Sequence, residues 1–197
     1  MSIIRAFIAI PIPAPLQKRI WRETAPLRNS IERGIIRWVV PENIHLTLKF
    51  LGNTSEENLD SLKKILAQEI EKIPAFEISL KKIGAYPNIS RPNVIWLGVE
   101  ESGKLISLQK SVETVASQIG SVPEKRRFSA HLTLGRVSRK GYDKESRVKI
   151  RTMLEKNPSY DFGKVRVKSI QLFESQLKES GAEYRSLFEA KLGEFFE

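Results

Sequence analysis

Two stretches of this 197-residue chain are almost identical: Ile44-His45-Leu46-Thr47-Leu48 and Ala130-His131-Leu132-Thr133-Leu134. They share the tetrapeptide His-Leu-Thr-Leu, and its two copies contain both histidines of the chain. Apolar and polar residues alternate in each copy, which is typical of a half-buried β-strand. The repeat therefore predicts two related strands, nearly half a chain apart.

Strand geometry assigns the residues of each copy to two faces, because successive side chains in a β-strand point in opposite directions. One face is apolar and is expected to lie against the core, whereas the other presents a histidine beside a threonine. The expected core residues are Ile44, Leu46, Leu48 and Phe50 in the first strand and Phe128, Ala130, Leu132 and Leu134 in the second. The opposite faces carry His45, Thr47 and Lys49, and Ser129, His131 and Thr133.

A repeat at this separation predicts two similar lobes related by an approximate two-fold axis. If their polar faces meet across a cleft, His45 and His131 converge on a small ligand. Imidazole titrates near neutral pH, so a neutral and a protonated histidine can act as general base and general acid. A phosphodiester held between them is cleaved in line, while the hydroxyls of Thr47 and Thr133 donate hydrogen bonds to its non-bridging oxygens.

Two other interpretations of the histidines are weaker. A lone histidine in a strand is usually an ordinary surface or half-buried residue, but here both histidines share one tetrapeptide. A zinc site normally uses at least three protein ligands, and the chain offers two histidines and no cysteine. Carboxylates could complete a zinc site, yet neither motif contains one. The pattern therefore predicts a reaction without metal or cofactor.

The chain is expected to form one α+β domain over residues 1–197, because many of its strands are short and joined by hairpin-like turns. Expected strands cover residues 3–10, 36–40, 44–51, 76–83, 94–99, 128–137, 165–174 and 182–192. Expected helices cover residues 16–32 with a break at Pro26, 54–73 behind a capping box of Thr54 and Glu57, 104–119 and 148–154. Polar loops are expected at residues 85–93 and 139–146, and the last two strands should form a hairpin that turns near residues 178–181.

The formal net charge is +10, from 33 basic and 23 acidic side chains. Such an excess attracts polyanions, so nucleic acid or nucleotide is the favoured partner, although basic residues can also serve solubility alone. The apolar N-terminus is too short to span a bilayer and, with its early charge and prolines, is not typical of a signal peptide. No membrane association is expected, and the absence of cysteine suits a reducing cytoplasm.

At these residues the sequence closely resembles the two-histidine phosphoesterases, and among them the LigT-like RNA 2′,3′-cyclic phosphodiesterases, first described as 2′–5′ RNA ligases. The hallmark of that superfamily is a pair of His-x-Ser/Thr-hydrophobic motifs, and both copies of the tetrapeptide match it. The similarity runs over nearly the whole chain. It includes RAFIAI at 5–10, RWVVPENIHLTLKFLGNT at 37–54, YPNISRPNVIWLGV at 86–99, HLTLGRV at 131–137 and SIQLFES at 169–175.

The resemblance implies a bilobal α+β fold, in which two pseudo-symmetric lobes of antiparallel-rich sheet with flanking helices enclose an active site in the central cleft. It implies hydrolysis of RNA 2′,3′-cyclic phosphate ends to 2′-phosphomonoesters, with His45 as proton donor and His131 as proton acceptor. It also implies a weak reverse reaction that joins RNA ends through a 2′–5′ linkage. Thr47, Thr133 and Arg136 would bind the phosphate.

Further basic and aromatic residues would extend this site. Strand alternation places Arg136 on the core side, so a bulge at Gly135 is needed to turn it toward the phosphate. Phe7 lies near the cleft in the family, where it would stack on a base or form part of the core. Arg91 would contact RNA phosphates or remain a solvated loop residue. The run Lys125–Arg127 is the densest positive cluster and precedes the second motif.

Two alternative functions remain open. A non-catalytic reader of RNA ends would need charge more than an acid–base pair, so the two intact histidines favour an enzyme. An enzyme with the same chemistry could act on a small cyclic nucleotide or an ADP-ribose cyclic phosphate, and the net charge favours RNA only weakly. We expect a cytoplasmic monomer that acts on RNA with 2′,3′-cyclic phosphate or 2′-phosphate ends.

Overall fold

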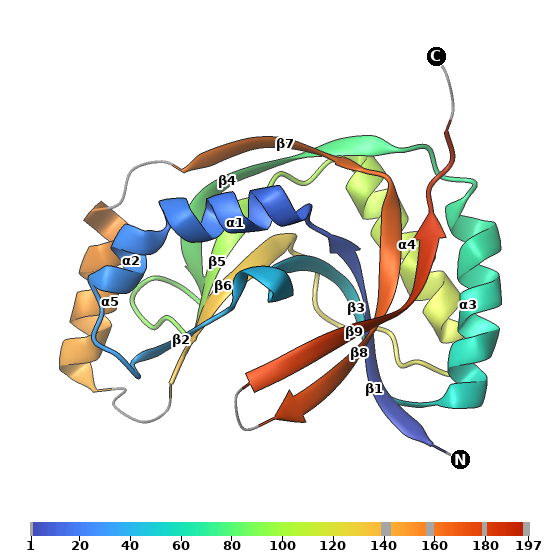
Figure 1. Cartoon of the computed structure of the whole chain (residues 1–197), viewed down its shortest axis with the longest axis horizontal. Coiled ribbons are helices and arrows are strands. Elements are labelled where there is room, and N and C mark those ends of the chain that lie inside the picture. Colours follow the sequence, from blue (N-terminus) through green and yellow to red (C-terminus); the bar gives the residue numbers. More distant parts are fainter. Residues whose placement is uncertain (1, 139–142, 157–159, 179–180, 195–197) are drawn as a thin grey trace.

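A computed structural model describes residues 2–138, 143–156, 160–178 and 181–194 (Figure 1). The strands are β1 (Ile3–Pro11), β2 (Ile36–Trp38), β3 (His45–Ser55), β4 (Phe76–Tyr86), β5 (Val94–Val99), β6 (His131–Val137), β7 (Asp161–Val167), β8 (Ser169–Lys178) and β9 (Gly181–Lys191). The helices are α1 (Ala14–Glu23), α2 (Ala25–Asn29), α3 (Glu56–Ile70), α4 (Gly103–Ser117) and α5 (Lys144–Lys156), with a short 3-10 helix η1 (Pro41–Asn43).

One antiparallel sheet contains all of these strands, in the order β7-β4-β5-β6-β3-β1-β8-β9, with β2 paired to β6 beside this path. The two motif strands, β3 and β6, are neighbours at its centre, where Leu46 pairs with Leu132. On one side of this pair lie β1, β8 and β9, and on the other lie β5, β4 and β7. The prediction of an α+β fold with two antiparallel lobes is confirmed, and the lobes are two halves of one curled sheet.

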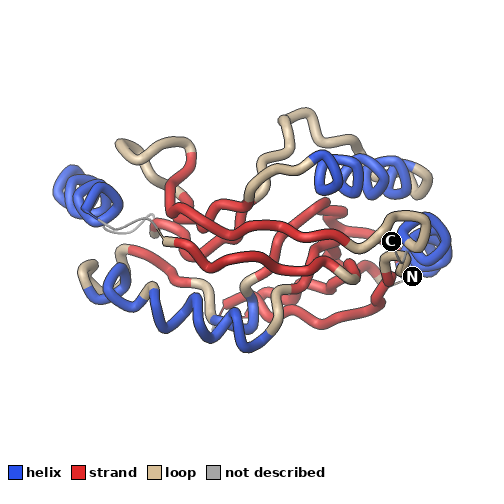
Figure 2. Tube along the Cα trace, turned by 90° about the horizontal axis from the view of Figure 1, so that it is seen from above, coloured by secondary structure: helices blue, strands red, loops and turns tan. Residues whose placement is uncertain are grey.

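The helices lie around the outside of the strands, as the view from above shows (Figure 2). The main core joins apolar residues of α1, α3 and α4, such as Ile20, Leu62 and Leu108, to Leu46 and Leu132 of the motif strands. A second cluster joins α2 and α5 to the half of the sheet that contains β5. The helices therefore bury the face of the sheet opposite to the one on which His45 and His131 lie.

A β-bulge lies at the last residue of the motif in each central strand. In β3, Thr47 pairs with Ala9 and Lys49 pairs with Ile8, so Leu48 is an extra residue. In β6, Thr133 pairs with Trp96 and Gly135 pairs with Ile95, so Leu134 is the extra residue. A bulge places two successive side chains on the same side of the sheet and thereby reverses the alternation beyond it.

The bulges correct two sequence predictions about β3. Lys49 was expected beside the histidine, but its 5% exposure places it on the buried, helix-covered face. Phe50 was expected in the core, but its side chain is 64% exposed. Both errors have one cause, because simple alternation fails after Leu48. In β6 the predicted bulge is present, one residue earlier than expected, and Arg136 is exposed.

Several predicted boundaries also shift. Gly52 does not end β3, because its positive φ of 70° accommodates a second irregularity and the strand continues to Ser55. Ser55, and not Thr54, caps α3, since its hydroxyl accepts a hydrogen bond from the backbone N–H of Asn58. Strand β4 runs three residues beyond its predicted end, to Tyr86.

The largest error concerns the predicted strand at residues 165–174. It is two strands, β7 and β8, which separate at Lys168 and lie in opposite halves of the sheet. The closing hairpin is therefore β8 with β9, and the turn residues 179–180 lie outside the described part of the chain. Helix α5 begins at Lys144, within the segment expected to be a polar loop, of which residues 139–142 also lie outside the description.

An ion pair behind the motif strand connects the sheet to the outer layer. The Nζ of Lys49 donates hydrogen bonds to Oε2 of Glu113 on α4, at 2.8 Å, and to the carbonyl oxygen of Val122, at 2.7 Å. The Lys49 side chain is only 3% exposed, and that of Glu113 is 22% exposed. Glu113 also accepts a hydrogen bond from Gln109, at 3.3 Å, but the loss of the ammonium group would leave this largely desolvated carboxylate without a cation.

We predict that Lys49→Met lowers the free energy of unfolding by about 1–3 kcal/mol, because Glu113 then loses its cation and the Val122 carbonyl loses its side-chain donor. The control is Lys63→Met, since Lys63 pairs with Asp60 on the surface of α3, where a pair contributes at most about 1 kcal/mol. Urea unfolding followed by circular dichroism measures both variants. Equal losses of unfolding free energy in the two variants would show that the buried pair contributes no more to stability than the surface pair.

Candidate active site

The pairing of β3 with β6 brings the two motifs together. Leu46 and Leu132 are partners in an antiparallel pair. Continuing this register by one residue in each direction places His45 opposite Thr133 and Thr47 opposite His131. The two histidines are then diagonal neighbours, about 7–8 Å apart at the backbone. All four side chains lie half-buried on the same face, so the predicted convergence of the histidines and threonines is observed.

Each imidazole is held in the same way. The Nδ1–H of His45 donates to the carbonyl oxygen of Asn43, and that of His131 donates to the carbonyl oxygen of Ser129, both at 2.8 Å. These bonds favour the tautomer that leaves Nε2 as an acceptor in the neutral ring. Nε2 of His45 lies 3.0 Å from the hydroxyl of Thr47, whereas Nε2 of His131 has no hydrogen-bond partner among the described residues. The Nε2 atoms of both histidines are thus the nitrogens that remain available on the open face.

Aromatic side chains hold the imidazole rings of both histidines in place. The rings of Tyr184 and His45 are nearly perpendicular, with centroids 5.2 Å apart and 83° between the planes, and those of Tyr86 and His131 are 5.0 Å apart at 80°. The hydroxyl of Tyr86 also lies 2.6 Å from that of Ser129, the residue whose carbonyl holds His131. Behind His45 lies Phe7, with its ring centroid 4.9 Å away. Each histidine is therefore fixed by a backbone carbonyl and a tyrosine.

Arg136 reaches the same face because of the bulge at Leu134. Its positive charge lowers the pKa values of both His45 and His131, which requires that the guanidinium lie near both rings. Among the described carboxylates none forms an ion pair with Arg136. An unneutralised guanidinium beside two imidazoles and two hydroxyls favours an anion such as phosphate.

Burial is the main reason that the pKa of His45 falls from 6.5 to about 4, opposed by its hydrogen bond to the Asn43 carbonyl and assisted by the charges of Arg136 and His131. The pKa of His131 is also lowered, chiefly by burial and further by Arg136. Without a ligand, the site thus keeps both rings neutral near pH 7. A bound phosphate would add negative charge and raise both pKa values.

The other residues predicted to contact RNA do not all lie beside the histidines. Phe7 is 3% exposed, which places it in the wall behind His45 and leaves no face on which a base could stack. Arg91 is exposed in the loop between β4 and β5, and no contact connects it to the histidines. The cluster Lys125–Arg127 is exposed, and Arg127 lies 3.3 Å from Glu101. RNA contacts of Arg91 and this cluster stay predictions.

Sequence reasoning missed four aromatic residues of the site: Phe50, Tyr86, Phe173 and Tyr184. Phe50, Tyr86 and Phe173 lie in the stretches 37–54, 86–99 and 169–175 that resemble the family, so a signal was present for these three. No motif marks Tyr184, which reaches His45 from the distant hairpin strand β9.

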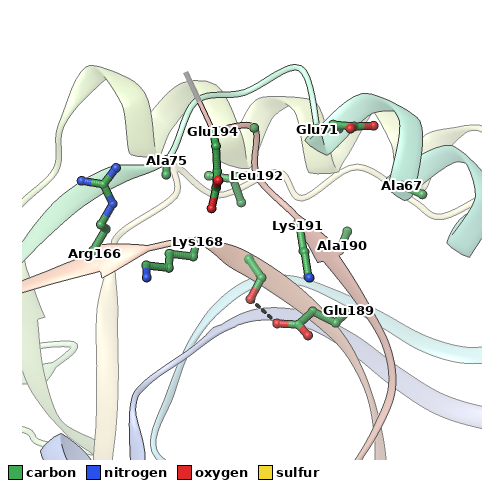
Figure 3. A pocket seen from close by; sticks show the side chains of 12 residues that line it. Ala67, Glu71, Ala75, Arg166, Lys168, Glu189, Ala190, Lys191, Leu192 and Glu194 are labelled. Atoms are coloured by element: carbon green, nitrogen blue, oxygen red, sulfur yellow. Dashed lines mark hydrogen bonds between the residues drawn. The ribbon is translucent and has the colours of Figure 1, made fainter. Parts of the chain in front are cut away.

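A separate groove of about 960 Å³ lies between α3 and strands β7 to β9 (Figure 3). Its lining mixes Arg166, Lys168 and Lys191 with Glu71, Glu189 and Glu194. Glu189 already accepts a hydrogen bond of 2.6 Å from Ser169, and neither histidine lines the groove. This groove therefore offers no chemistry that competes with the histidine pair.

The comparisons with known proteins agree with this geometry. The family of LigT-like phosphoesterases matches residues 10–96. An RNA 2′,3′-cyclic phosphodiesterase of Archaeoglobus fulgidus is 33% identical over 186 residues, which are 93% of this chain and 98% of that protein. The chain belongs to the LigT-like phosphoesterase family. The protein of the same name from Methanocaldococcus jannaschii is 36% identical, across 94% of this chain and 99% of its own length.

Solved structures of LigT-like phosphoesterases share the fold. Escherichia coli LigT in complex with 3′-AMP is 25% identical and superposes with a TM-score of 0.76, covering 97% of this chain and 99% of its own. The structure of E. coli LigT in complex with NADP⁺ is also 25% identical, with a TM-score of 0.76. A Thermus thermophilus protein at 24% identity has a TM-score of 0.78, which again supports the fold.

Two absences hold for the described part of the chain. No helix there has the length and apolar character needed to cross a bilayer. Across those same residues, no three side chains of histidine, cysteine, aspartate or glutamate lie close enough to hold a metal ion. Metal independence stays a prediction that rests on the chemistry of the histidine pair.

The lowered pKa of His45 predicts a pH-dependent stability. Between pH 6.5 and 4 the unfolded chain binds a proton at this residue that the folded protein does not, so stability present above pH 6.5 is lost as the pH falls toward 4. Wild-type protein should therefore lose more free energy of unfolding over this window than His45→Gln, by on the order of 2–3 kcal/mol.

Urea unfolding at pH 7 and pH 4.5 measures the free energy of unfolding of wild type and His45→Gln. His131→Gln is measured in the same way for comparison, because the pKa of His131 is also lowered. If wild type and His45→Gln lost the same free energy on acidification, His45 would not be held neutral by burial.

Proposed function

We propose that this protein hydrolyses the 2′,3′-cyclic phosphate ends of RNA to 2′-phosphomonoesters. The observation that carries the proposal is the pair of histidine–threonine motifs on adjacent central strands, with their Nε2 atoms on one open face beside Arg136. The Archaeoglobus and Methanocaldococcus relatives are named for this activity and match nearly the whole chain. The net charge of +10 favours RNA over a small cyclic nucleotide.

In the proposed reaction His131, as the neutral base, takes a proton from a water molecule whose oxygen attacks phosphorus. The P–O3′ bond breaks, and His45 donates a proton to the departing O3′, leaving a 2′-phosphomonoester. Thr47 and Thr133 donate hydrogen bonds to the non-bridging oxygens, and Arg136 balances the charge that develops on them. The chain's own residues supply both proton transfers, so the proposed reaction needs no metal or cofactor.

The donor role of His45 requires a proton that the free site does not hold at pH 7. Two features favour its uptake when substrate binds. The carbonyl of Asn43 accepts from Nδ1 and stabilises the charged ring, and a phosphate would neutralise Arg136, which otherwise lowers the pKa of His45. We therefore propose that the cyclic phosphate itself recruits the proton that His45 donates to O3′.

A 2′–5′ ligation would use the same groups in the same direction, with another nucleophile. If the 5′-hydroxyl of a second RNA end replaces water, His131 takes its proton and the product is a 2′–5′ phosphodiester. Such an end would approach from the open face of the central strands, but the reaction that we propose as the principal one is hydrolysis. A binding protein without turnover would need neither fixed imidazole tautomers nor two tyrosine rings packed against the imidazoles.

We predict that His45→Ala and His131→Ala each lower kcat by about 10²- to 10⁴-fold, the usual contribution of a positioned acid or base. Both rings are half-buried on the open face, so the fold should persist, and circular dichroism checks this. The assay follows a short RNA with a 2′,3′-cyclic phosphate. Near wild-type turnover by either variant would exclude the proposed mechanism.

The two roles are separated by a nucleoside 2′-phosphodiester whose leaving group is 4-nitrophenolate, which departs without a proton. His45→Ala should recover much of its lost rate on this substrate, whereas His131→Ala should not. Recovery by His131→Ala alone would mean that the acid and the base are exchanged.

A further inference from the structure

Strand β2 places a second arginine beside Arg136. Arg37, the middle residue of β2, is the cross-strand partner of Arg136 on β6, and it is exposed. Directly paired residues of antiparallel strands project from the same face of a sheet. The preceding residue, Ile36, is 5% exposed and belongs to the core cluster that joins α2 and α5 to the sheet. Arg37 therefore points away from the helices, onto the open face that carries the histidines.

Neither of these two guanidiniums is neutralised by the described part of the chain. Among the described carboxylates none forms an ion pair with Arg37 or Arg136. Glu32, which precedes β2, is already paired with Lys149 on α5, at 2.6 Å. Like charges directly opposite each other on paired strands destabilise a sheet. The arginine pair therefore lowers the stability of the free protein, and a bound anion would relieve the repulsion between its members.

Arg37 lies farther along β6 than the residues that face the reacting phosphate. Thr133 lies opposite His45, and Arg136 follows Thr133 by three residues, one of which is the extra residue Leu134 of the bulge. At about 3.3 Å per residue, Arg37 is displaced from His45 by about 7–10 Å along the strand. This displacement is comparable to the spacing of successive phosphates in an extended nucleic acid strand.

The loop between β4 and β5 borders the same end of the sheet. The N–H of Val137 donates to the carbonyl oxygen of Asn93, at 2.9 Å, which holds this loop beside the end of β6. Arg91 in the loop is exposed, and no described carboxylate forms an ion pair with it. The end of β6 at which β2 pairs thus carries several cations without a counterion, a distribution that attracts a polyanion.

We propose that Arg37 binds the first internal phosphate of the RNA, on the 5′ side of the nucleoside whose cyclic phosphate lies between the histidines. The inference rests on the proposed function and adds the direction in which the RNA leaves the site, along β6 toward β2. The internal phosphate does not react, so this contact contributes equally to the binding of substrate and transition state. Arg37 therefore distinguishes an RNA end from a nucleoside cyclic phosphate, which has no internal phosphate.

The test uses three substrates with the same reacting group: a dinucleotide 2′,3′-cyclic phosphate, the same dinucleotide with a neutral methylphosphonate linkage, and a nucleoside 2′,3′-cyclic phosphate. Arg37→Gln should raise KM for the charged dinucleotide by about 5- to 30-fold, the weight of one exposed charge-assisted contact, and leave kcat unchanged. KM for the other two substrates should not change. The salt dependence of binding the charged dinucleotide should also fall, by a slope of about 0.7 for one phosphate of a single strand.

Arg166→Gln is the matched control, because Arg166 is an exposed arginine on β7, at an edge of the sheet, and its loss changes the net charge equally. This variant should keep the wild-type KM for all three substrates. Thermal unfolding without ligand separates binding from a structural role. Arg37→Gln should be at least as stable as wild type, because the repulsion between Arg37 and Arg136 is removed.

The outcomes separate this inference from the proposed function. If wild type turned over none of the three substrates, the proposed function would fail. If wild type were active and Arg37→Gln left KM for the charged dinucleotide unchanged, or raised KM equally for the charged and the neutral dinucleotide, the contact with the internal phosphate would be excluded while the histidine mechanism stood. A lower melting temperature with equal losses on all three substrates would assign Arg37 to the fold and overturn the inference in the same way.

Discussion

The antiparallel pairing of β3 with β6 at Leu46 and Leu132 is the constraint on which the site depends. Each motif alone offers one histidine and one threonine on a strand, and only the adjacency of the strands makes a four-residue constellation. The buried leucines hold this register, because a slip of one residue would turn both histidines into the core. Burial on the helix side and chemistry on the open side are thus consequences of the same alternation.

The two bulges place side chains on the open face that strand alternation alone would bury. A regular strand would direct Arg136 and Phe50 toward the helices, where an unpaired guanidinium is costly. The extra residues Leu134 and Leu48 place the side chains of Arg136 and Phe50 on the open face. Lys49 is then buried on the helix side, where it forms an ion pair with Glu113. The face that carries the histidines and the packing behind it are therefore coupled through two local irregularities of the sheet.

The sequence predicts the elements that repeat or alternate and fails where distant parts meet. Both histidines, both threonines and the buried leucines follow from a four-residue motif and strand periodicity. Residues 165–174 look like one strand, and only their pairing with β4 on one side and with β1 and β9 on the other divides them. Tyr184 against His45 and the exposure of Phe50 depend on register and bulges, which periodicity does not encode.

The most direct test of the central claim is the identity of the product isomer. A short RNA with a 2′,3′-cyclic phosphate is incubated with the protein in the presence of a chelator, and the terminal phosphate is assigned by phosphorus NMR. Protonation of O3′ by His45 predicts a 2′-phosphomonoester alone, formed at the same rate with and without the chelator. A 3′-phosphomonoester, or turnover that stops in the chelator and returns with one metal, would contradict the account.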